Sequence, residues 1–227
     1  MEKKYLAHLF GASICTFALL PVISASANPA ISLQDPPENS VYIEDIVYGG
    51  TGCPNGTVGT SVAPNGLNFG VSFDQYIAGI GDGYNRADKR KYCELRINLH
   101  IPSGYSYAIA DIIYRGYAEL DKGIVGTLKS RYRFQGELLE AGFSKTIRGQ
   151  VDKDFAYEDT LDLESYVWSD CGATAPVVLN TQIRLNATPV AAPEAGGTIG
   201  VDSVEGKLTQ EYGLVWRRCG EVAGTFE

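Results

Sequence analysis

Apolar and polar side chains alternate with a period of two residues along several stretches of the chain. The clearest stretch has apolar side chains at every second position from Cys93 to Ile101, with polar side chains between them. Residues 179–185 and 208–217 repeat the pattern. Such a period is typical of a β-strand with one buried face. The chain is therefore expected to contain several half-buried strands.

The apolar pattern changes phase within the segment 105–117. Its large apolar residues occupy odd positions as far as Ile109 and even positions from Ile112, and Asp111 lies where the phase changes. An extra residue in one strand of an antiparallel pair produces such a shift. We therefore expect a β-bulge or a strand switch near Ala110 and Asp111.

Short turn signals separate the predicted strands. Pro64-Asn65-Gly66, Pro102-Ser103-Gly104 and Glu205-Gly206 each lie between two strand-like segments. Turns this short favour antiparallel hairpins. Helical periodicity is scarce, with room for a short helix at 85–91 or 161–166, and residues 190–197 are interpreted as a flexible loop. These features predict an all-β protein, an antiparallel sandwich of the Greek-key or jelly-roll kind.

The first 27 residues have the pattern of a cleavable signal peptide. Lys3 and Lys4 precede a mainly apolar run from Leu6 to Leu20, and Ala25-Ser26-Ala27 supplies small residues before a cut at Asn28. The run is shorter than the roughly 20 apolar residues of a spanning helix. We therefore expect a secreted protein, extracellular or periplasmic, without a membrane span after cleavage.

The remaining length suits one domain. Residues 28–40 contain three prolines and are expected to form an extended lead-in. Residues 41–220 are assigned to a single β-sandwich domain, and residues 221–227 to a C-terminal tail.

The chain is acidic, with a formal net charge of −8 that becomes −9 when two lysines and one glutamate leave with the signal peptide. An acidic chain repels phosphate backbones and anionic lipids. Nucleic acid and membrane surfaces are therefore not expected as partners. The basic run 86–91 is interpreted as a solvated loop face.

Four cysteines remain in the mature chain, Cys53, Cys93, Cys171 and Cys219. An even number in an exported chain favours two disulfides. A four-thiolate zinc site is disfavoured because no two cysteines have the close spacing of zinc ligands. The predicted pairing is Cys53–Cys93 with Cys171–Cys219, which ties each strand end to a loop within one half of the chain. The nested pairing, Cys53–Cys219 with Cys93–Cys171, stays open as the alternative.

Three blocks of sequence carry a resemblance to a known family: 49–56 (GGTGCPNG), 90–117 (from RKYCEL to YRGY) and 201–219 (from VDSVEG to WRRC). In these blocks the chain resembles a family of secreted bacterial and fungal proteins, domain of unknown function number 4360. The resemblance implies a secreted, cysteine-bridged β domain of about this length, and it implies no activity. Residues 137–170 match the family pattern least.

Histidine and cysteine leave little material for catalysis. His100 is the single histidine of the mature chain and falls on the polar face of a predicted strand. A multi-histidine metal site is thereby excluded and Ser-His catalysis is disfavoured. Bridged cysteines provide no thiol nucleophile. No catalytic residue, metal site or cofactor is assigned.

Carboxylates are plentiful between residues 152 and 164. A calcium site is one interpretation of this run, because calcium takes several carboxylate oxygens. The run lacks the spacing of a calcium-binding loop, which favours a solvated acidic loop. Asp111 and Asp202 interrupt regular strand patterns and are candidate site residues. A carboxylate pair drawn from distant positions would suit a glycosidase-like hydrolase.

Aromatic side chains supply the remaining candidates. Tyr166 and Trp168 lie in a loop-like stretch just before Cys171. Exposed aromatic rings stack on sugars and anchor protein partners. The leading hypothesis is a non-enzymatic secreted module that binds a glycan or protein at the cell surface, or belongs to the envelope or matrix. The alternative is a secreted hydrolase that uses a carboxylate pair.

Overall fold

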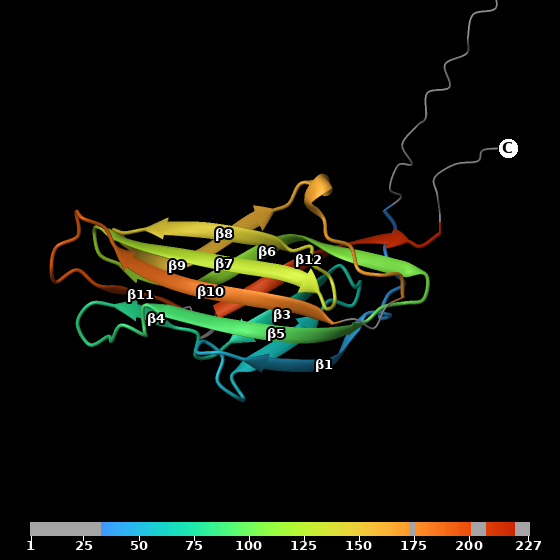
Figure 1. Ribbon diagram of the computed structural model, residues 1–227, viewed down its shortest axis with the longest axis horizontal. Coiled ribbons are helices and arrows are strands. Elements are labelled where there is room, and N and C mark those ends of the chain that lie inside the picture. Colours follow the sequence, from blue (N-terminus) through green and yellow to red (C-terminus); the bar gives the residue numbers. More distant parts are fainter. Residues whose placement is uncertain (1–32, 173–175, 201–207, 221–227) are drawn as a thin grey trace, which may run out of the picture.

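The computed structural model describes residues 33–172, 176–200 and 208–220. The predicted signal peptide, Asp202 and the C-terminal tail lie outside the described residues. The described part of the chain forms twelve antiparallel strands and one 3₁₀ turn, η1 (Leu163–Ser165). Figure 1 shows the strands in two layers, with the five-stranded sheet in front and the seven-stranded sheet behind it.

The five-stranded sheet has the order β1 (Tyr42–Gly49), β5 (Arg90–His100), β10 (Val177–Ala187), β7 (Ile124–Phe134) and β8 (Ala141–Arg148). The seven-stranded sheet has the order β2 (Val58–Val62), β3 (Asn68–Phe73), β12 (Leu208–Arg218), β6 (Tyr105–Leu120), β11 (Gly197–Gly200) and β4 (Ala78–Ile80). Its seventh strand, β9 (Val151–Thr160), pairs with the free edge of β6.

The predicted antiparallel β-sandwich is confirmed. Alternation buries one face of each long strand, as in β7 and β12, where every second side chain points into the interior. Aromatic rings fill the space between the sheets. The Tyr107 ring lies 5.2 Å from Phe134 and 5.3 Å from Trp216, centroid to centroid, so strands of both sheets meet around it.

A chain of buried polar side chains also crosses the interior. The Gln210 amide donates to the Thr181 hydroxyl at 2.7 Å and accepts from the Tyr212 hydroxyl at 2.7 Å. The Tyr212 hydroxyl lies 2.9 Å from the Ser130 hydroxyl. Thr181 and Ser130 belong to the five-stranded sheet, and the other two belong to the seven-stranded sheet. Because buried polar groups are costly unless paired, this network favours one alignment of the two layers.

The predicted irregularity in the long strand is confirmed as a bulge. Gly213 of β12 faces Asp111 of β6, but the next residue of β12 faces Ile109, so Ala110 is the extra residue. From Ile112 onward only the even positions of β6 are fully buried, whereas residues 105–110 are all buried.

Two of the three predicted hairpins are wrong. The Pro64-Asn65-Gly66 turn does join paired strands, β2 and β3. The Pro102-Ser103-Gly104 turn instead carries the chain from β5 in one sheet to β6 in the other. The Glu205-Gly206 turn itself lies outside the described residues, and the described strands on either side of it, β11 and β12, both pair with β6 and not with each other. A short turn fixes how the chain reverses, but not which sheet the next strand joins.

The acidic segment corrects a further interpretation. Residues 151–160 form strand β9 at a sheet edge rather than a solvated loop. Asp152, Asp154 and Glu158 are exposed because they occupy the outward positions of this edge strand, whereas Asp159 is half-buried and accepts a hydrogen bond from the Ser144 backbone amide of β8. The helix considered at 161–166 is reduced to η1, and residues 85–89 form turns ahead of β5 instead of a helix.

Both disulfides have the predicted pairing. Cys53 lies in the loop after β1 and is bonded to Cys93 of β5, with their Cα atoms 5.6 Å apart. Cys171 is bonded to Cys219, just beyond β12, with a Cα separation of 5.9 Å. The first pair is buried and Cys171 is exposed. Each sheet therefore has one disulfide of its own.

Within the described ranges, no helix is long and apolar enough to cross a bilayer.

Candidate functional site

The outer face of the seven-stranded sheet carries an open hollow. Outward-pointing residues that face one another on neighbouring strands form rows across the sheet. The register of β2, β3, β12 and β6 gives three such rows here. The hollow encloses about 520 Å³ and is lined by β2, β3, β12 and one residue of β6, namely Gly59, Thr60, Ser61, Asn68, Gly70, Val71, Ser72, Arg115, Thr209, Gln210 and Glu211. This face of the sheet is therefore hollowed and predominantly polar.

Glycines form the floor of this hollow. A β-carbon on Gly59 would lie 2.7 Å from the Ser72 hydroxyl oxygen, and one on Gly70 would lie 2.8 Å from the Ser61 hydroxyl oxygen. The serine hydroxyls thus lie above the glycines of the neighbouring strand, in the space that a side chain would fill. The result is a floor of backbone and hydroxyl groups, low enough for a ligand to approach the sheet closely.

Charged side chains stand beside the floor. Arg115 of β6 faces Thr209 of β12, and Glu211 lies one row further along β12. Neither Arg115 nor Glu211 makes an ion pair with any described residue. Both groups can therefore hydrogen-bond a ligand, the guanidinium as a donor and the carboxylate as an acceptor.

Asp111 lies beside this site, in the next row of outward positions after Glu211. The bulge in β6 places it there. A β-carbon on Gly213 would come within 2.2 Å of an Asp111 carboxylate oxygen, so the carboxylate occupies the space that this glycine leaves open. Burial raises the pKa of Asp111, and the charges of Glu158 and Glu211 raise it further, while the Gly213 backbone amide acts in the opposite direction. Three carboxyl groups from β6, β9 and β12 therefore influence one another here.

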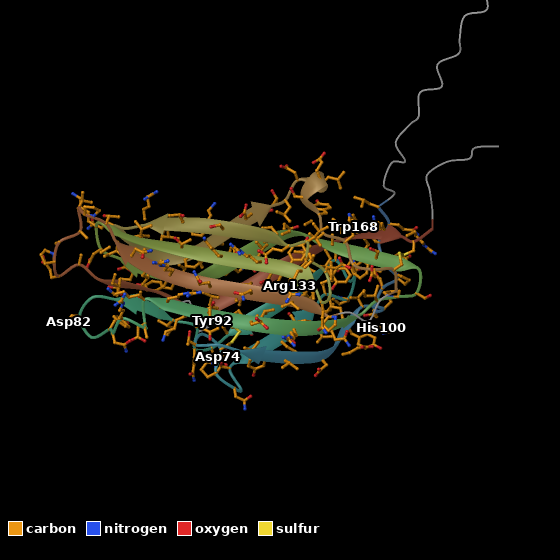
Figure 2. The ribbon with its side chains drawn as sticks, in the orientation of Figure 1. Asp74, Asp82, Tyr92, His100, Arg133 and Trp168 are labelled. Atoms are coloured by element: carbon orange, nitrogen blue, oxygen red, sulfur yellow. A yellow bond between two sulfur atoms is a disulfide. The ribbon has the colours of Figure 1, made fainter. Side chains whose placement is uncertain are left out.

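Trp168 and Tyr166 lie elsewhere, at the end of the sandwich where β12 finishes. The guanidinium carbon of Arg217 lies 4.3 Å from the centre of the Trp168 ring, and the Tyr166 ring packs edge-on at 6.1 Å. Burial lowers the pKa of Arg217. Both rings remain half-exposed, and Figure 2 labels Trp168 at this end.

A hydrogen-bonded segment holds these aromatic rings in place. The Ser169 backbone amide donates to the Tyr107 carbonyl at 2.8 Å, and the Ser106 hydroxyl donates to the Ser169 carbonyl at 2.7 Å. The segment therefore bonds to β6 along the same edge as β9, beyond the point where β9 ends. The rings are positioned by backbone pairing rather than by a free loop.

The sequence candidates thus separate into two places. Asp111 borders the hollow, Tyr166 and Trp168 form the aromatic end, and Asp202 lies outside the described residues. Arg115, Thr209 and Glu211 were missed, although each is a polar residue at an outward position of a predicted strand. The signal that groups them is the pairing of β6, β12 and β3, which the alternation pattern alone does not contain.

His100 and the acidic strand offer no metal centre. The His100 ring stacks on Tyr42 at 4.5 Å, and its Nδ1 lies 3.1 Å from a Glu44 carboxylate oxygen. In the parts of the chain that the structure describes, no three His, Cys, Asp or Glu side chains form a group that could hold a metal ion. Asp152 accepts a hydrogen bond from the Tyr117 hydroxyl, which raises the pKa of Tyr117 to about 12.

The fold and the two disulfides define a cysteine-bridged β-sandwich domain of the secreted kind. The chain belongs to the family that shares a domain of unknown function, DUF4360, whose family model matches residues 39–219. It is 40% identical over 184 residues to an uncharacterized secreted protein of Arthroderma benhamiae, covering 81% of this chain and 74% of the relative. The protein is secreted, and its disulfides fit an oxidising location outside the cytosol.

Among solved structures, the chain is similar to TmCBM61 in complex with β-1,4-galactotriose. The identity is 13%, the TM-score is 0.28, and the match covers 77% of this chain and 89% of that one. The galactotriose belongs to that neighbour.

Proposed function

We propose that this protein is a non-enzymatic extracellular module that binds a glycan in the hollow on the outer face of the seven-stranded sheet. The observation that supports the proposal is the glycine floor bordered by hydroxyl, guanidinium and carboxylate groups. Every sugar hydroxyl is both a donor and an acceptor, and serine and threonine hydroxyls match it in both roles. Arg115 and Glu211 add one charged donor and one charged acceptor.

The shape of the hollow favours a chain over a single small molecule. Its lining comes from four strands side by side, so a polymer can lie across the strands and contact each of them. A low, open site keeps much of its ligand in water, and its affinity then comes from several weak hydrogen bonds rather than one buried group. The proposed ligand is accordingly a polysaccharide segment of several sugar units.

The experiment measures binding of the mature protein to a panel of neutral polysaccharides, including glucans, xylans, mannans, galactans and chitin, by affinity electrophoresis and calorimetry. Three variants alter the hollow: Arg115→Met, Thr209→Val and Gly70→Leu. Gly70→Leu should abolish binding because it fills the floor, and the other two should each weaken binding roughly fivefold to tenfold by removing one hydrogen bond.

Thr146→Val is the matched control, because Thr146 is an exposed strand threonine on the opposite sheet. It should leave binding unchanged. A polysaccharide that binds Gly70→Leu as tightly as the unaltered protein would contradict the assignment of the hollow. Absence of binding to every member of the panel would contradict the proposed function itself.

A second candidate function is hydrolysis of a glycan by the carboxyl groups around Asp111. The raised pKa of Asp111 favours it, because a general acid must keep its proton near the working pH. Glu211 or Glu158 would then provide the second carboxylate. Release of reducing ends from a bound polysaccharide, lost in Asp111→Asn with binding retained, would support this activity. Binding without any release by the unaltered protein would exclude it for that polysaccharide.

A further inference from the structure

The outer face of the five-stranded sheet has the opposite chemistry from the hollow. Cationic side chains occupy outward positions on four of its five strands. We call this surface the basic face, and it comprises Arg90, Arg96, Lys129, Arg131, Arg133, Arg148 and Arg184. All are exposed except Arg133, which is half-exposed. Figure 2 looks onto this face and shows Arg133 and Tyr92 on it.

The register places cations directly beside cations. Arg90 of β5 is paired with Arg184 of β10. On β7, Lys129, Arg131 and Arg133 occupy three consecutive outward positions. Like charges directly opposite each other destabilise a sheet. Folding stability therefore does not account for this arrangement, whereas an anionic ligand would.

The acidic groups on this face do not neutralise it. Arg96 forms an ion pair with Glu94 at 3.4 Å, and Arg131 forms one with Glu140 at 3.0 Å. The carboxyl groups of β1 lie at the edge of the sheet, where Glu44 bonds Asn98 and His100. Among the described residues no ion pair forms at Arg90, Lys129, Arg133, Arg148 or Arg184.

A small hollow lies within the basic face. It encloses about 330 Å³ between β5, β10 and β7, and it is lined by Arg90, Lys129, Arg131, Glu140, Asn180 and Gln182. The Gln182 side chain accepts from the Arg90 guanidinium at 2.7 Å and so fixes its position. Amide groups of Asn180 and Gln182 lie between the cations, where they can bond hydroxyl groups of a ligand.

This concentration of positive charge runs against the composition of the chain, whose formal net charge is −8. Negative charge is concentrated on the opposite outer face. There β6, β9 and β12 have carboxylates at outward positions, namely Asp111, Glu119, Asp152, Asp154, Glu158 and Glu211. Such segregation produces a positive potential on one face that attracts anions despite the negative total charge.

We propose that the basic face binds an acidic polysaccharide, a polymer whose sugar units carry carboxylate groups. The row of cations on β7 repeats at every second residue, about 6.7 Å apart, so that one extended polyanion can contact several of them. The neighbouring amides suit the sugar hydroxyls. A secreted protein meets such polymers outside the cell. This site is on the opposite side of the sandwich from the proposed glycan hollow and does not depend on it.

The experiment measures binding of the mature protein to polygalacturonate and to its fully methyl-esterified form, which retains the backbone and lacks the charge. The triple variant Lys129→Gln, Arg131→Gln, Arg133→Gln tests the face. Its matched control, Arg86→Gln, Lys122→Gln, Lys153→Gln, removes the same charge from exposed positions elsewhere. Polygalacturonate should bind, with an affinity that falls as salt rises, and the triple variant should bind at least about tenfold more weakly.

The control variant should change the affinity by less than about twofold, and the esterified polymer should not bind. An equal loss in both variants would overturn the proposal, because net charge alone would then account for binding. Tighter binding of single-stranded DNA than of polygalacturonate would overturn the ligand class. Salt-sensitive self-association without polymer binding would assign the face to a second copy of this chain. Arg115→Met should leave this binding unchanged, which separates its outcome from that of the hollow.

Discussion

The two outer faces of the sandwich are built on the same strand pattern and carry different chemistry. On the seven-stranded sheet, outward positions hold glycine, serine, threonine and carboxylates, which leave a hollow. On the five-stranded sheet, outward positions of equal geometry hold arginine and lysine. The inward positions of both sheets hold mainly apolar side chains, with most of the aromatic rings on the seven-stranded sheet. Folding therefore constrains the inward-pointing residues of each strand, and the outward-pointing residues are available for binding.

The largest expected effect comes from damaging the interior that both faces share. Trp216 is fully buried and its indole donates to the Gly66 carbonyl at 2.9 Å. Trp216→Ala should lower the free energy of unfolding by about 3–5 kcal/mol. Denaturant unfolding followed by circular dichroism measures it. Trp168→Ala, at the half-exposed aromatic end, is the matched control and should cost clearly less. Equal losses would contradict the assignment of Trp216 to the shared core.

The two disulfides offer a comparison between the sheets. Each closes a loop of 40 or 48 residues, so removing either pair by double Cys→Ala substitution should cost about 4 kcal/mol. Access to reductant should differ, because Cys53 and Cys93 are buried and Cys171 is exposed. Mild reduction followed by alkylation and peptide mapping should label Cys171 and Cys219 first. Labelling of Cys53 first in the folded protein would show that the buried pair is the more accessible one.

A smaller effect should separate the bulge from the rest of the seven-stranded sheet. Gly213→Ala introduces a β-carbon into the space of the Asp111 carboxylate and should cost about 1–3 kcal/mol. The second change Asp111→Ala removes the clash, so the double variant should recover part of this loss. Thermal unfolding of the two single variants and the double variant measures the coupling. Additive losses would mean that the carboxylate does not occupy that space.

The smallest expected effect is a pH dependence. The pKa of Asp111 is raised in the folded state, so the folded protein binds more protons than the unfolded chain as the pH rises above about 4. The associated stability is present in acid and is lost as the pH rises through the folded pKa. Asp111→Asn should therefore unfold at a higher temperature than the unaltered protein at pH 7, with the difference shrinking towards pH 3.

Asp88 provides a control of opposite sign. A hydrogen bond from Lys91 holds the pKa of Asp88 below its ordinary value. Its contribution is present above the unfolded pKa and lost as the pH falls through the folded one. Asp88→Asn should therefore lower the melting temperature at pH 7 and have little effect in strong acid. The same sign for both variants would show that the two carboxyl groups do not differ as described.

The sequence predicted which side chains of a strand are buried and which are exposed wherever apolar and polar residues alternate regularly. The inward set of β5 and the bulge at Ala110 both follow from the spacing of apolar residues. The disulfide pairing followed from strand ends. Strand β9 was missed because an edge strand with an exposed outer face contains few apolar residues, and its acids suggested a loop. Alternation of charge with Phe155 and Tyr157 was the available signal.

The candidate sites could be predicted only in part. Asp111 was found because it broke a pattern, and Trp168 because it is a rare residue in a polar stretch. Arg115 and Glu211 break no pattern, and they meet through the pairing of β6 with β12, which are about a hundred residues apart in sequence. The basic face likewise assembles four strands. Register between distant strands is a tertiary property, so single-strand patterns do not reveal such surfaces.

The placement of the disulfides has a mechanical consequence. Neither bond joins a strand of one sheet to a strand of the other: Cys53–Cys93 tethers a loop to β5, and Cys171–Cys219 tethers a loop to the end of β12. A force that pulls the two outer faces apart therefore meets no disulfide between strands of the two layers, and the covalent links between the layers are the chain segments that pass from one sheet to the other, such as residues 102–104. The force is also resisted by the packed aromatic rings and by the buried hydrogen bonds between the layers, which include those from Gln210 to Thr181 and between Tyr212 and Ser130. Under such tension the layers would separate before the strands within either sheet.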